Sequence, residues 1–348
     1  MSESTHGAIP GLIPPSPVSP TIDLQAPGAR HGHLRLPWSR NDSAWGNLMI
    51  PVSVIAGDRP GPTALITGAN HGDEYEGPLA ILDLAHSLAP SEVAGRVILL
   101  PFMNHPAFRA GTRVSPIDGV NMNRCFPGGP DQSITRQIAD YVFRALVSPA
   151  DIVLDFHSGG KTLDFLPFAA SHVLGDPGHD ARCAAAARAF NAPYTVKMLE
   201  IDNVGMLDTA VESLGKTFVT TELRGGGTAT AESVGVARKG LRNVLIHAGI
   251  LDEPPEVGPS RFLDMPSLDC FTFAREAGLL EMLVDLGQPV RRGQTIARIW
   301  PTDRSGAAPE PCLAGLDGVL AARHFPGLIQ PGDTVSVVAV EDPEAAAG

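Results

Sequence analysis

The sequence predicts an α/β fold, with a mostly parallel or mixed sheet flanked by helices and a small all-β domain after it. Short, wholly apolar runs alternate with helix-like segments over residues 47–250, which is typical of strands that are covered on both faces. Pro254, Pro255 and Pro259 then mark a boundary. Beyond them, residues 260–340 contain short β-type runs separated by Gly and Pro turns, as expected for a small β-sandwich.

Three parts of the chain follow from these changes of pattern. Residues 1–45 are expected to form an extended, proline-rich N-terminal arm, because no helix can run through the closely spaced prolines of residues 8–20. Residues 46–255 are expected to form the catalytic α/β domain, and residues 256–348 the C-terminal β-sandwich domain. A neighbouring subunit in a homo-oligomer is one partner for such an arm, and a flexible tail is the alternative.

The elements of the α/β domain are predicted from local patterns. Apolar and β-branched runs predict strands at 48–56, 63–68, 96–100, 151–156 and 217–221. Helical spacing of apolar residues, or a high alanine content, predicts helices at 78–88, 133–146, 181–190 and 231–248. Ligand sites in such folds lie at the carboxyl ends of the strands, so the residues that follow each strand are the first candidates for chemistry.

Composition narrows the class of protein. Apolar residues make up 43% of the 348 residues, which is enough to bury a core and excludes global disorder. The formal charge of −12 repels phosphate backbones, so a nucleic-acid partner is not expected. No apolar run reaches the ~20 residues that span a bilayer, and the N-terminus lacks the features of a secretory signal. With four widely spaced cysteines, we expect a cytoplasmic protein with free thiols and no membrane partner.

The C-terminal segments GQPVRRGQ and GLIQPGDTV resemble each other and look like the β-sandwich of biotinyl or lipoyl carrier domains. Those carriers attach their cofactor to a lysine at the tip of a hairpin. The last lysine of this chain is Lys239, which precedes the predicted β-domain. A carrier function is therefore excluded, and we expect the β-domain to be structural or to cover a pocket.

The strongest chemical signal follows the strand at 63–68, in the segment GANHGDEYEGP of residues 68–78. His71 and Glu74 are three residues apart, and a turn before a helix that opens at Gly77 can bring both side chains to one point. An imidazole nitrogen and a carboxylate oxygen are good zinc ligands. A catalytic zinc ion takes three protein ligands and leaves one position open for water, so a third ligand is needed.

His157 is the candidate third ligand, in the segment DIVLDFHSGG of residues 151–160. It stands where a buried strand ends. Asp155, two residues earlier, points to the same side of the strand and can accept a hydrogen bond from a ligand histidine, which fixes the tautomer. A histidine bonded only to backbone at the end of the strand is the alternative.

Glu222 ends a third buried strand, in the segment TTELRGGG of residues 220–227. A metal-dependent hydrolase needs a carboxylate that takes a proton from the attacking water and later passes it to the leaving amine. Glu222 is in the expected place for this base. An ion pair with Arg224 is the alternative.

A loop of weak periodicity supplies further candidates, in the segment FRAGTRVSPIDGVNMNRCFPG of residues 108–128. Arg113 can stabilise the oxyanion of a tetrahedral intermediate. Asn123 and Arg124 can clamp a carboxylate, because a guanidinium group makes two parallel hydrogen bonds to it. Solvated loop charges are the alternative for each residue alone.

The four motifs together resemble the succinylglutamate desuccinylase/aspartoacylase family, a branch of the zinc carboxypeptidase-like fold. The resemblance covers about residues 47–250, with a family-like β-domain after it. The segments NHGDEYEGP, NMNRCFPG, LDFHSGG and TELRGGG are most similar to the branch of the family that deacetylates N-acetyl-L-2,4-diaminobutyrate in ectoine degradation.

The resemblance implies a site and a mechanism. One zinc ion (Zn2+) per chain would be bound by His71, Glu74 and His157. Glu222 would be the general base and acid of a zinc-dependent amidohydrolase that releases acetate and a diamino acid. Arg113 would polarise the scissile carbonyl group, although the interval from Arg113 to the following Asn-Met-Asn segment is longer here than in aspartoacylases.

The resemblance also implies a substrate. Asn123 and Arg124 would hold the α-carboxylate of a small N-acyl amino acid, and the enzyme would be coupled to an upstream ectoine hydrolase. Aspartoacylases use a tyrosine from the later part of the chain, and no tyrosine follows Tyr194, which argues against aspartoacylase activity. Another N-acyl amino acid deacylase of the family, such as a succinylglutamate desuccinylase, is one alternative. A relative that binds a metabolite without turnover is another.

The side chain of diaminobutyrate is a cation, which an acidic group in the pocket would suit. The sequence does not choose among the acidic candidates, which are Asp155, Asp164, Glu200 and Asp202.

Overall fold

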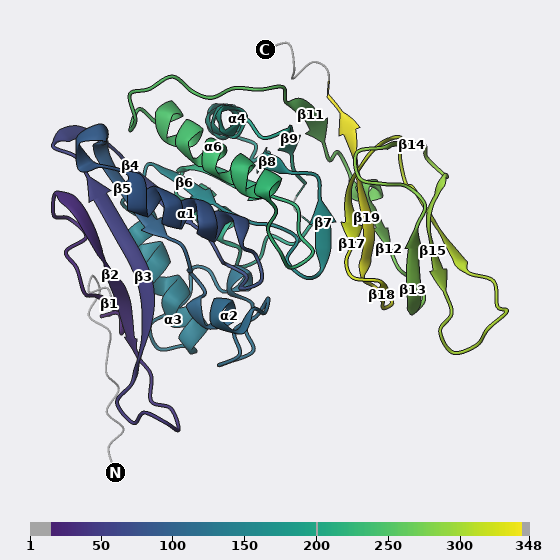
Figure 1. The fold of residues 1–348 in the computed structure, drawn as a ribbon, viewed down its shortest axis with the longest axis horizontal. Coiled ribbons are helices and arrows are strands. Elements are labelled where there is room, and N and C mark those ends of the chain that lie inside the picture. The colour runs from purple at the N-terminus through teal and green to yellow at the C-terminus, as the bar shows by residue number, and fades with distance from the viewer. Residues whose placement is uncertain (1–14, 200, 343–348) are drawn as a thin grey trace.

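The computed structural model describes residues 15–199 and 201–342. Figure 1 shows an α/β unit, in which helices lie on both faces of a twisted sheet, beside a smaller unit made of β-strands. The predicted α/β class, with a mixed sheet and an antiparallel sheet near the C-terminus, is confirmed. Among the described residues, no helix combines the length and the apolar composition needed to cross a bilayer.

The sheet of the α/β unit is mixed. Its strands are β1 (Ser19–Pro20), β2 (Gly28–Pro37), β3 (Asn47–Ala56), β4 (Arg59–Thr67), β5 (Ala94–Leu100), β6 (Ile152–Asp155), β8 (Phe168–Ser171), β9 (Tyr194–Lys197) and β10 (Thr217–Glu222). At its centre β4 pairs in parallel with β5 and β6, and β6 pairs in parallel with β10. Antiparallel strands β3 and β8 flank this group. The carboxyl ends of β4, β6 and β10 therefore meet at one edge.

Helices cover the two faces of the sheet. They are α1 (Glu76–Ser87), α2 (His105–Ala110), α3 (Ile134–Tyr141), α4 (Pro177–Phe190), α5 (Leu207–Glu212) and α6 (Ala231–His247). A π-helical segment (Val142–Val147) continues α3, and short 3-10 helices occupy Pro90–Glu92, Met122–Arg124 and Leu268–Cys270. Leu65 and Ile66 of β4 pack into two different apolar cores, because neighbouring side chains of a strand point to opposite faces.

The two cores contain different helices. α1, α4 and α6 pack on the Ile66 side, together with Leu154 and Val219. α3, α5 and the strand β2 pack on the Leu65 side, together with Val153 and Phe218. Both faces of β4, β6 and β10 are thus buried at their centres, which explains the short apolar runs 64–66, 152–154 and 218–219 in the sequence.

Some elements differ from their predicted extents. The helix predicted at 181–190 begins earlier, at Pro177, because Pro is well suited to the first helical position and the side chain of Asp176 accepts hydrogen bonds from the backbone N–H groups of Gly178 and His179. Within the expected N-terminal arm, residues 28–37 form β2, which pairs with β3 along its whole length. Residues 1–14 of that arm lie outside the described residues.

The C-terminal unit is joined to the main sheet by hydrogen-bonded strands. Its strands are β11 (Arg261–Asp264), β12 (Phe271–Phe273), β13 (Gly278–Met282), β14 (Pro289–Val290), β15 (Thr295–Trp300), β16 (Glu310–Leu313), β17 (Gly318–His324), β18 (Leu328–Ile329) and β19 (Thr334–Glu341). β11 pairs with both β9 and β19, so the main sheet continues through β19 into β17 and β14. β16, β15, β13 and β18 form a separate antiparallel sheet.

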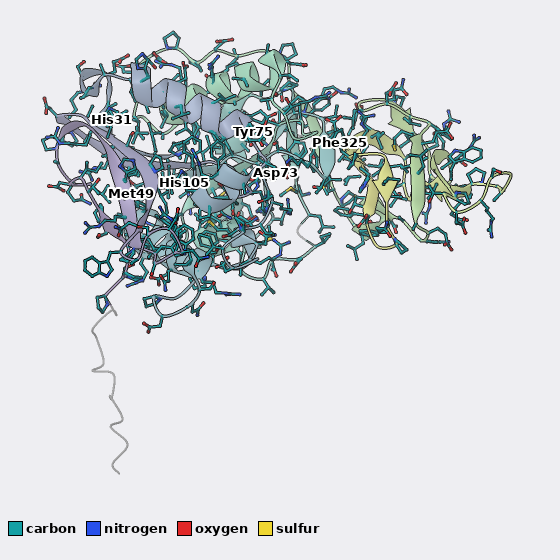
Figure 2. The ribbon with its side chains drawn as sticks, turned by 60° about the horizontal axis from the view of Figure 1, so that its bottom comes forward. His31, Met49, Asp73, Tyr75, His105 and Phe325 are labelled. Atoms are coloured by element: carbon teal, nitrogen blue, oxygen red, sulfur yellow. The ribbon has the colours of Figure 1, made fainter. Side chains whose placement is uncertain are left out.

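A second junction lies next to the edge where β4, β6 and β10 end. The short strand β7 (Leu163–Phe165) pairs with β17, and the backbone N–H of Phe325 donates to the carbonyl of Thr162 at 2.8 Å. Phe325, which Figure 2 labels between the two units, is the side chain that a Cβ on Gly226 would contact. The C-terminal unit therefore contacts the loops that follow β6 and β10.

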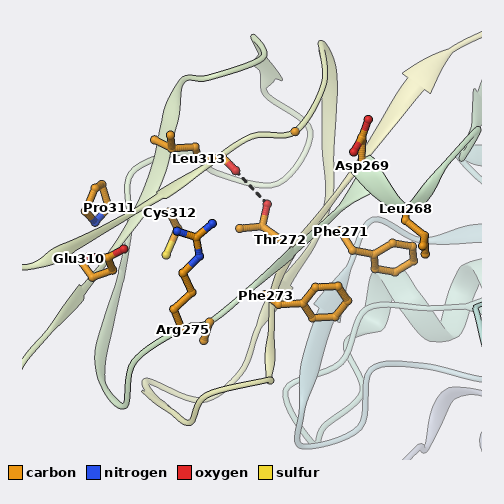
Figure 3. A pocket seen from close by; sticks show the side chains of 12 residues that line it. Leu268, Asp269, Phe271, Thr272, Phe273, Arg275, Glu310, Pro311, Cys312 and Leu313 are labelled. Atoms are coloured by element: carbon orange, nitrogen blue, oxygen red, sulfur yellow. Dashed lines mark hydrogen bonds between the residues drawn. The ribbon is translucent and has the colours of Figure 1, made fainter.

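A groove of about 530 Å3 lies within the C-terminal unit. Figure 3 shows its lining, in which the Thr272 hydroxyl donates to the carbonyl of Leu313 at 3.1 Å. Cys312 of this lining is one of four cysteines, all buried and free, as the sequence predicts. Among the described residues, the group of side chains spaced to hold a metal ion lies elsewhere, in the α/β unit.

Candidate active site

The loop between β4 and α1 brings His71 and Glu74 to one point. Gly72 packs so closely on α2 that a Cβ there would lie 2.0 Å from the carbonyl carbon of Ala107, and Ala69 adopts a left-handed φ of 52°. In the resulting turn, Nδ1 of His71 lies 2.7 Å from Oε1 of Glu74. Both side chains are buried. The three-residue spacing therefore has the geometry that the sequence predicts.

His157 joins this pair from the end of β6. Its Nδ1 lies 3.0 Å from Oε2 of Glu74, so the two imidazoles face the two oxygens of one carboxylate. One ligand atom from each of the three residues lies within 4.8 Å of the others. Two imidazole nitrogens and one carboxylate oxygen are the ligand set of a catalytic zinc site of the open, three-ligand type.

The Nε2 atom of each imidazole, on the side away from Glu74, also forms a hydrogen bond. Nε2 of His157 donates to Oδ2 of Asp155 at 2.9 Å, and Nε2 of His71 donates to the amide oxygen of Asn121 at 3.2 Å. With a hydrogen on Nε2, a neutral ring has its lone pair on Nδ1, directed at Glu74. A nitrogen lone pair and a carboxylate oxygen at this distance need a proton or a cation between them, so the donor set fits a metal ion.

Hydrogen bonds fix the surroundings of the three residues. Asp155 also accepts from the Thr67 hydroxyl at 2.6 Å and from the Asn70 amide at 3.2 Å. Asp73, which is labelled in Figure 2 and follows His71 by two residues, accepts from the backbone N–H of Lys161 at 2.8 Å. This last bond ties the loop before α1 to the loop that follows His157. The Asp155 position agrees with the period-two argument from the sequence.

Glu222 and His157 occupy equivalent positions at the ends of the neighbouring parallel strands β10 and β6. The parallel register aligns Thr220 of β10 with Asp155 of β6, so the residues two positions further along are neighbours. Oε2 of Glu222 is buried, with no hydrogen-bond partner among the described residues. Burial, followed by the negative charge of Glu74, raises the pKa of the Glu222 carboxyl to about 8. The alternative pairing with Arg224 is not found, because Arg224 approaches Asp164 instead, at 3.7 Å.

Arg113 reaches the same centre from the loop after α2. Its Nη1 lies 3.3 Å from Nδ1 of His71 and 3.8 Å from Oε1 of Glu74. The Arg113 side chain is 41% exposed, so its remaining N–H groups are accessible to a ligand. The long interval after Arg113 in the sequence does not prevent this approach.

Asn123 and Arg124 lie in the 3-10 helix Met122–Arg124. The amide oxygen of Asn123 accepts from the backbone N–H of Leu207 at 3.0 Å, which leaves its NH2 group for other partners. Arg124 donates to its neighbour's carbonyl, that of Asn123, at 2.7 Å and to Oδ2 of Asp202 at 2.9 Å. These bonds orient the guanidinium group.

A pocket of about 180 Å3 is lined by the three candidate metal ligands together with Arg113, Asn123, Arg124 and Glu222. Asp155 lies behind His157, outside this lining. Two residues that sequence reasoning missed also belong to the site, one through a hydrogen bond to a candidate ligand and one as part of the pocket lining. Asn121 accepts a hydrogen bond from His71. The one feature of the sequence that could have identified it is its position two residues before Asn123. Asp208 lines the pocket from the start of α5, and no pattern in the sequence marks it. The other lining residues include Leu163, Phe165, Met198 and Met206.

Comparison with known proteins gives the family. Residues 60–248 match the succinylglutamate desuccinylase/aspartoacylase catalytic domain. The chain is 52% identical over 332 residues to an N-alpha-acetyl-L-2,4-diaminobutyric acid deacetylase from Halomonas elongata, covering 95% of this chain and 97% of that protein.

Solved structures of similar chains support the same family. A product-bound structure of the ectoine utilization protein EutE (DoeB) from Ruegeria pomeroyi is 56% identical, with a TM-score of 0.92 and coverage of 94% of this chain and 99% of that one. A succinylglutamate desuccinylase from Silicibacter sp. TM1040 is 55% identical, with the same TM-score and coverage of 95% and 100%. This chain therefore belongs to the succinylglutamate desuccinylase/aspartoacylase family.

Proposed function

We propose that this protein is a zinc-dependent amidohydrolase that converts N-α-acetyl-L-2,4-diaminobutyrate into L-2,4-diaminobutyrate and acetate. The observation that carries the proposal is the convergence of His71, Glu74 and His157 in one pocket with Glu222, whose Oε2 is buried. The substrate is supported by the 52% identity to the Halomonas elongata deacetylase over nearly the whole of both chains.

The protein groups suit each requirement of amide hydrolysis. A zinc ion held by His71, Glu74 and His157 would polarise the acetyl carbonyl group and lower the pKa of water. Glu222 takes a proton from the attacking water and returns it to the leaving nitrogen. Burial, followed by the charge of Glu74, raises the pKa of this carboxyl, which favours a group that holds the proton between the two transfers. The C–N bond breaks and a C–O bond forms, which gives acetate and a free α-amino group.

The remaining polar groups orient the substrate. Arg113, beside His71, donates a hydrogen bond to the carbonyl oxygen as negative charge develops on it. Asn123 and Arg124 hold the α-carboxylate of the substrate. In this arrangement the scissile amide, next to the α-carbon, lies between the α-carboxylate clamp and the metal ligands.

Acetate release tests the proposal. Wild-type protein is assayed with N-α-acetyl-L-2,4-diaminobutyrate, N-acetylaspartate and N-succinylglutamate, and its zinc content is measured before and after chelation. We expect release from the diaminobutyrate compound, loss of release with the metal, and recovery on adding zinc. Turnover of one of the other two compounds alone would favour a different deacylase of the family. Bound zinc without turnover of any compound would overturn the substrate. Neither metal nor turnover would favour a metabolite-binding role.

The proposal extends to the setting of the reaction. Four buried, free cysteines suit a reducing cytoplasm. The Ruegeria pomeroyi protein is named for ectoine utilization, which supports a place in ectoine degradation, after a hydrolase that opens the ectoine ring. A homo-oligomer is part of the same proposal, and sedimentation of the purified chain measures it.

A further inference from the structure

The proposed substrate carries a positive charge that the groups described so far do not bind. Its side chain ends in an ammonium group, and a pocket that recognises such a group needs a carboxylate that is not already paired. The following inference rests on the proposed function, because it concerns the charge of that substrate.

Most acidic residues near the pocket already have partners. Asp155 is bonded to His157. Asp164 accepts two hydrogen bonds from Arg323, at 3.0 and 3.2 Å, and also lies near Arg224. Asp202 pairs with Arg124. Glu200, the fourth candidate from the sequence, lies outside the described residues.

Asp208 differs from all of these. It lines the pocket, and it is buried, with 6% of its surface exposed. Its hydrogen-bond donors are the backbone N–H and the hydroxyl of Thr209, at 2.6 and 3.3 Å, and both act on Oδ1. Among the residues that the structure describes, no Lys, Arg or His forms an ion pair with it. A buried carboxylate without a cationic partner is costly, and a cationic ligand in the pocket would offset that cost.

The position of Asp208 is set by the loop that would bind the α-carboxylate. The backbone N–H of Leu207, the preceding residue, donates to the side chain of Asn123. Slightly earlier, the carbonyl of Gly205 accepts from Phe126 N–H at 2.9 Å. A Cβ on Gly205 would lie 2.7 Å from the carbonyl oxygen of Arg124. The segment that carries Asp208 is therefore packed directly on the Asn123–Arg124 segment.

We propose that Asp208 determines the substrate specificity of this enzyme by binding the side-chain ammonium group of the N-acetylated diamino acid. Asn123 and Arg124 would bind the α-carboxylate at one point, and Asp208 would bind the ammonium group at a second. The same negative charge would repel the side-chain carboxylate of N-acetylaspartate.

Asp208→Asn tests this, assayed with two substrates of equal shape. N-α-acetyl-L-2,4-diaminobutyrate carries the charge, and N-α-acetyl-L-norvaline replaces the ammonium group by a methyl group. Wild-type enzyme should prefer the charged substrate in kcat/KM by at least about 30-fold, because loss of one partner of a buried charge pair has a large effect. In Asp208→Asn, which keeps the acceptor for Thr209, this preference should be lost while turnover of the norvaline compound is kept.

The ratio of the two kcat/KM values does not depend on how much of the variant is folded, so partial misfolding does not affect the result. Asp252→Asn, which removes the same charge from an exposed position, is the matched control and should keep the preference. If Asp208→Asn has no activity with either substrate, the same ratio of kcat/KM values is measured for Asp208→Ser and compared with the wild-type ratio.

The outcomes separate the two proposals. A wild-type enzyme that cleaves both substrates equally well, or an Asp208 variant that keeps the preference for the charged one, would overturn the role of Asp208 and leave the deacetylase proposal standing. A wild-type enzyme that cleaves neither compound would overturn the deacetylase proposal, and the role of Asp208 with it.

Discussion

Asp155 and Glu74 lie on opposite sides of the His157 ring. Oδ2 of Asp155 is 2.9 Å from Nε2 of His157, and Oε2 of Glu74 is 3.0 Å from Nδ1 of the same ring. The carboxylates of Asp155 and Glu74 outweigh the effect of burial, which acts against a charged ring, and raise the pKa of His157 well above its usual value. The carboxylate behind the ring therefore increases the electron-donating capacity of Nδ1 on the side where a metal would bind.

The first prediction concerns that carboxylate. Asp155→Asn keeps an oxygen that can accept from Nε2 but removes the negative charge. We expect zinc affinity to fall by about 10- to 100-fold, measured by competition with a chromophoric chelator. Asp252→Asn, which removes the same charge from an exposed position, is the control and should bind zinc as the wild type does. Unchanged zinc affinity in Asp155→Asn would contradict a role for Asp155 in supporting the ligand.

The second prediction separates metal binding from proton transfer. Glu222→Gln keeps the shape of the side chain but cannot take up a proton. We expect zinc content to stay at one per chain and kcat to fall by about 10²- to 10⁴-fold, measured as acetate release at saturating substrate. A kcat within a few-fold of the wild-type value would mean that another group transfers the proton.

The third prediction concerns the α-carboxylate. Arg124→Ala should raise KM for N-α-acetyl-L-2,4-diaminobutyrate by about 10- to 100-fold, since a hydrogen bond to a charged group contributes about 1.5–3 kcal/mol. A substrate whose α-carboxylate is converted to a primary amide lacks that interaction, and its kcat/KM should change little in the variant. Equal losses on both substrates would place Arg124 in another role.

The fourth prediction concerns the start of α1, next to Glu74. A Cβ on Gly77 would lie 2.2 Å from Cβ of Phe156, so Gly77→Ala overpacks this contact between helix and strand. We expect a loss of about 1–3 kcal/mol in the free energy of unfolding, measured by urea denaturation, together with weaker zinc binding. Gly235→Ala in α6 is the matched control, because no atom lies within 4 Å of its added Cβ.

At Gly235 the same substitution should instead stabilise the protein by about 0.5–1 kcal/mol, since alanine is the better helix former. If both alanine variants destabilise the protein equally, the close approach of Gly77 to Phe156 does not account for the effect.

The sequence predicts that the central residues of the candidate site lie together, and they do, because the ends of strands are local features. Glu74 and His71 share one turn, and His157 and Glu222 each end an apolar run, so a parallel sheet brings them to one edge. This prediction does not require knowledge of how distant loops contact one another. Asp155 was found for the same reason, since the period of a strand fixes the side on which it lies.

The outer parts of the site were less predictable because they depend on how one loop folds onto another. Asp208 enters the pocket only because Leu207 bonds to Asn123, 84 residues earlier, and neither segment carries a periodic pattern. Asp164 looked available from the sequence, but the pairing of β7 with β17 places it beside Arg323. β2 was missed as a strand because prolines dominate the residues before it.

The pairing of β7 with β17 limits how the enzyme can be divided. A fragment that ends after α6 would keep His71, Glu74, His157 and Glu222. It would leave β7 without its partner strand and expose the edge of β9 that β11 covers. Unpaired strand edges favour aggregation, and the loop after His157 would lose its contact with Phe325. We therefore expect a fragment that ends after α6 to aggregate more readily than the whole chain, and engineered truncations to need the C-terminal strands.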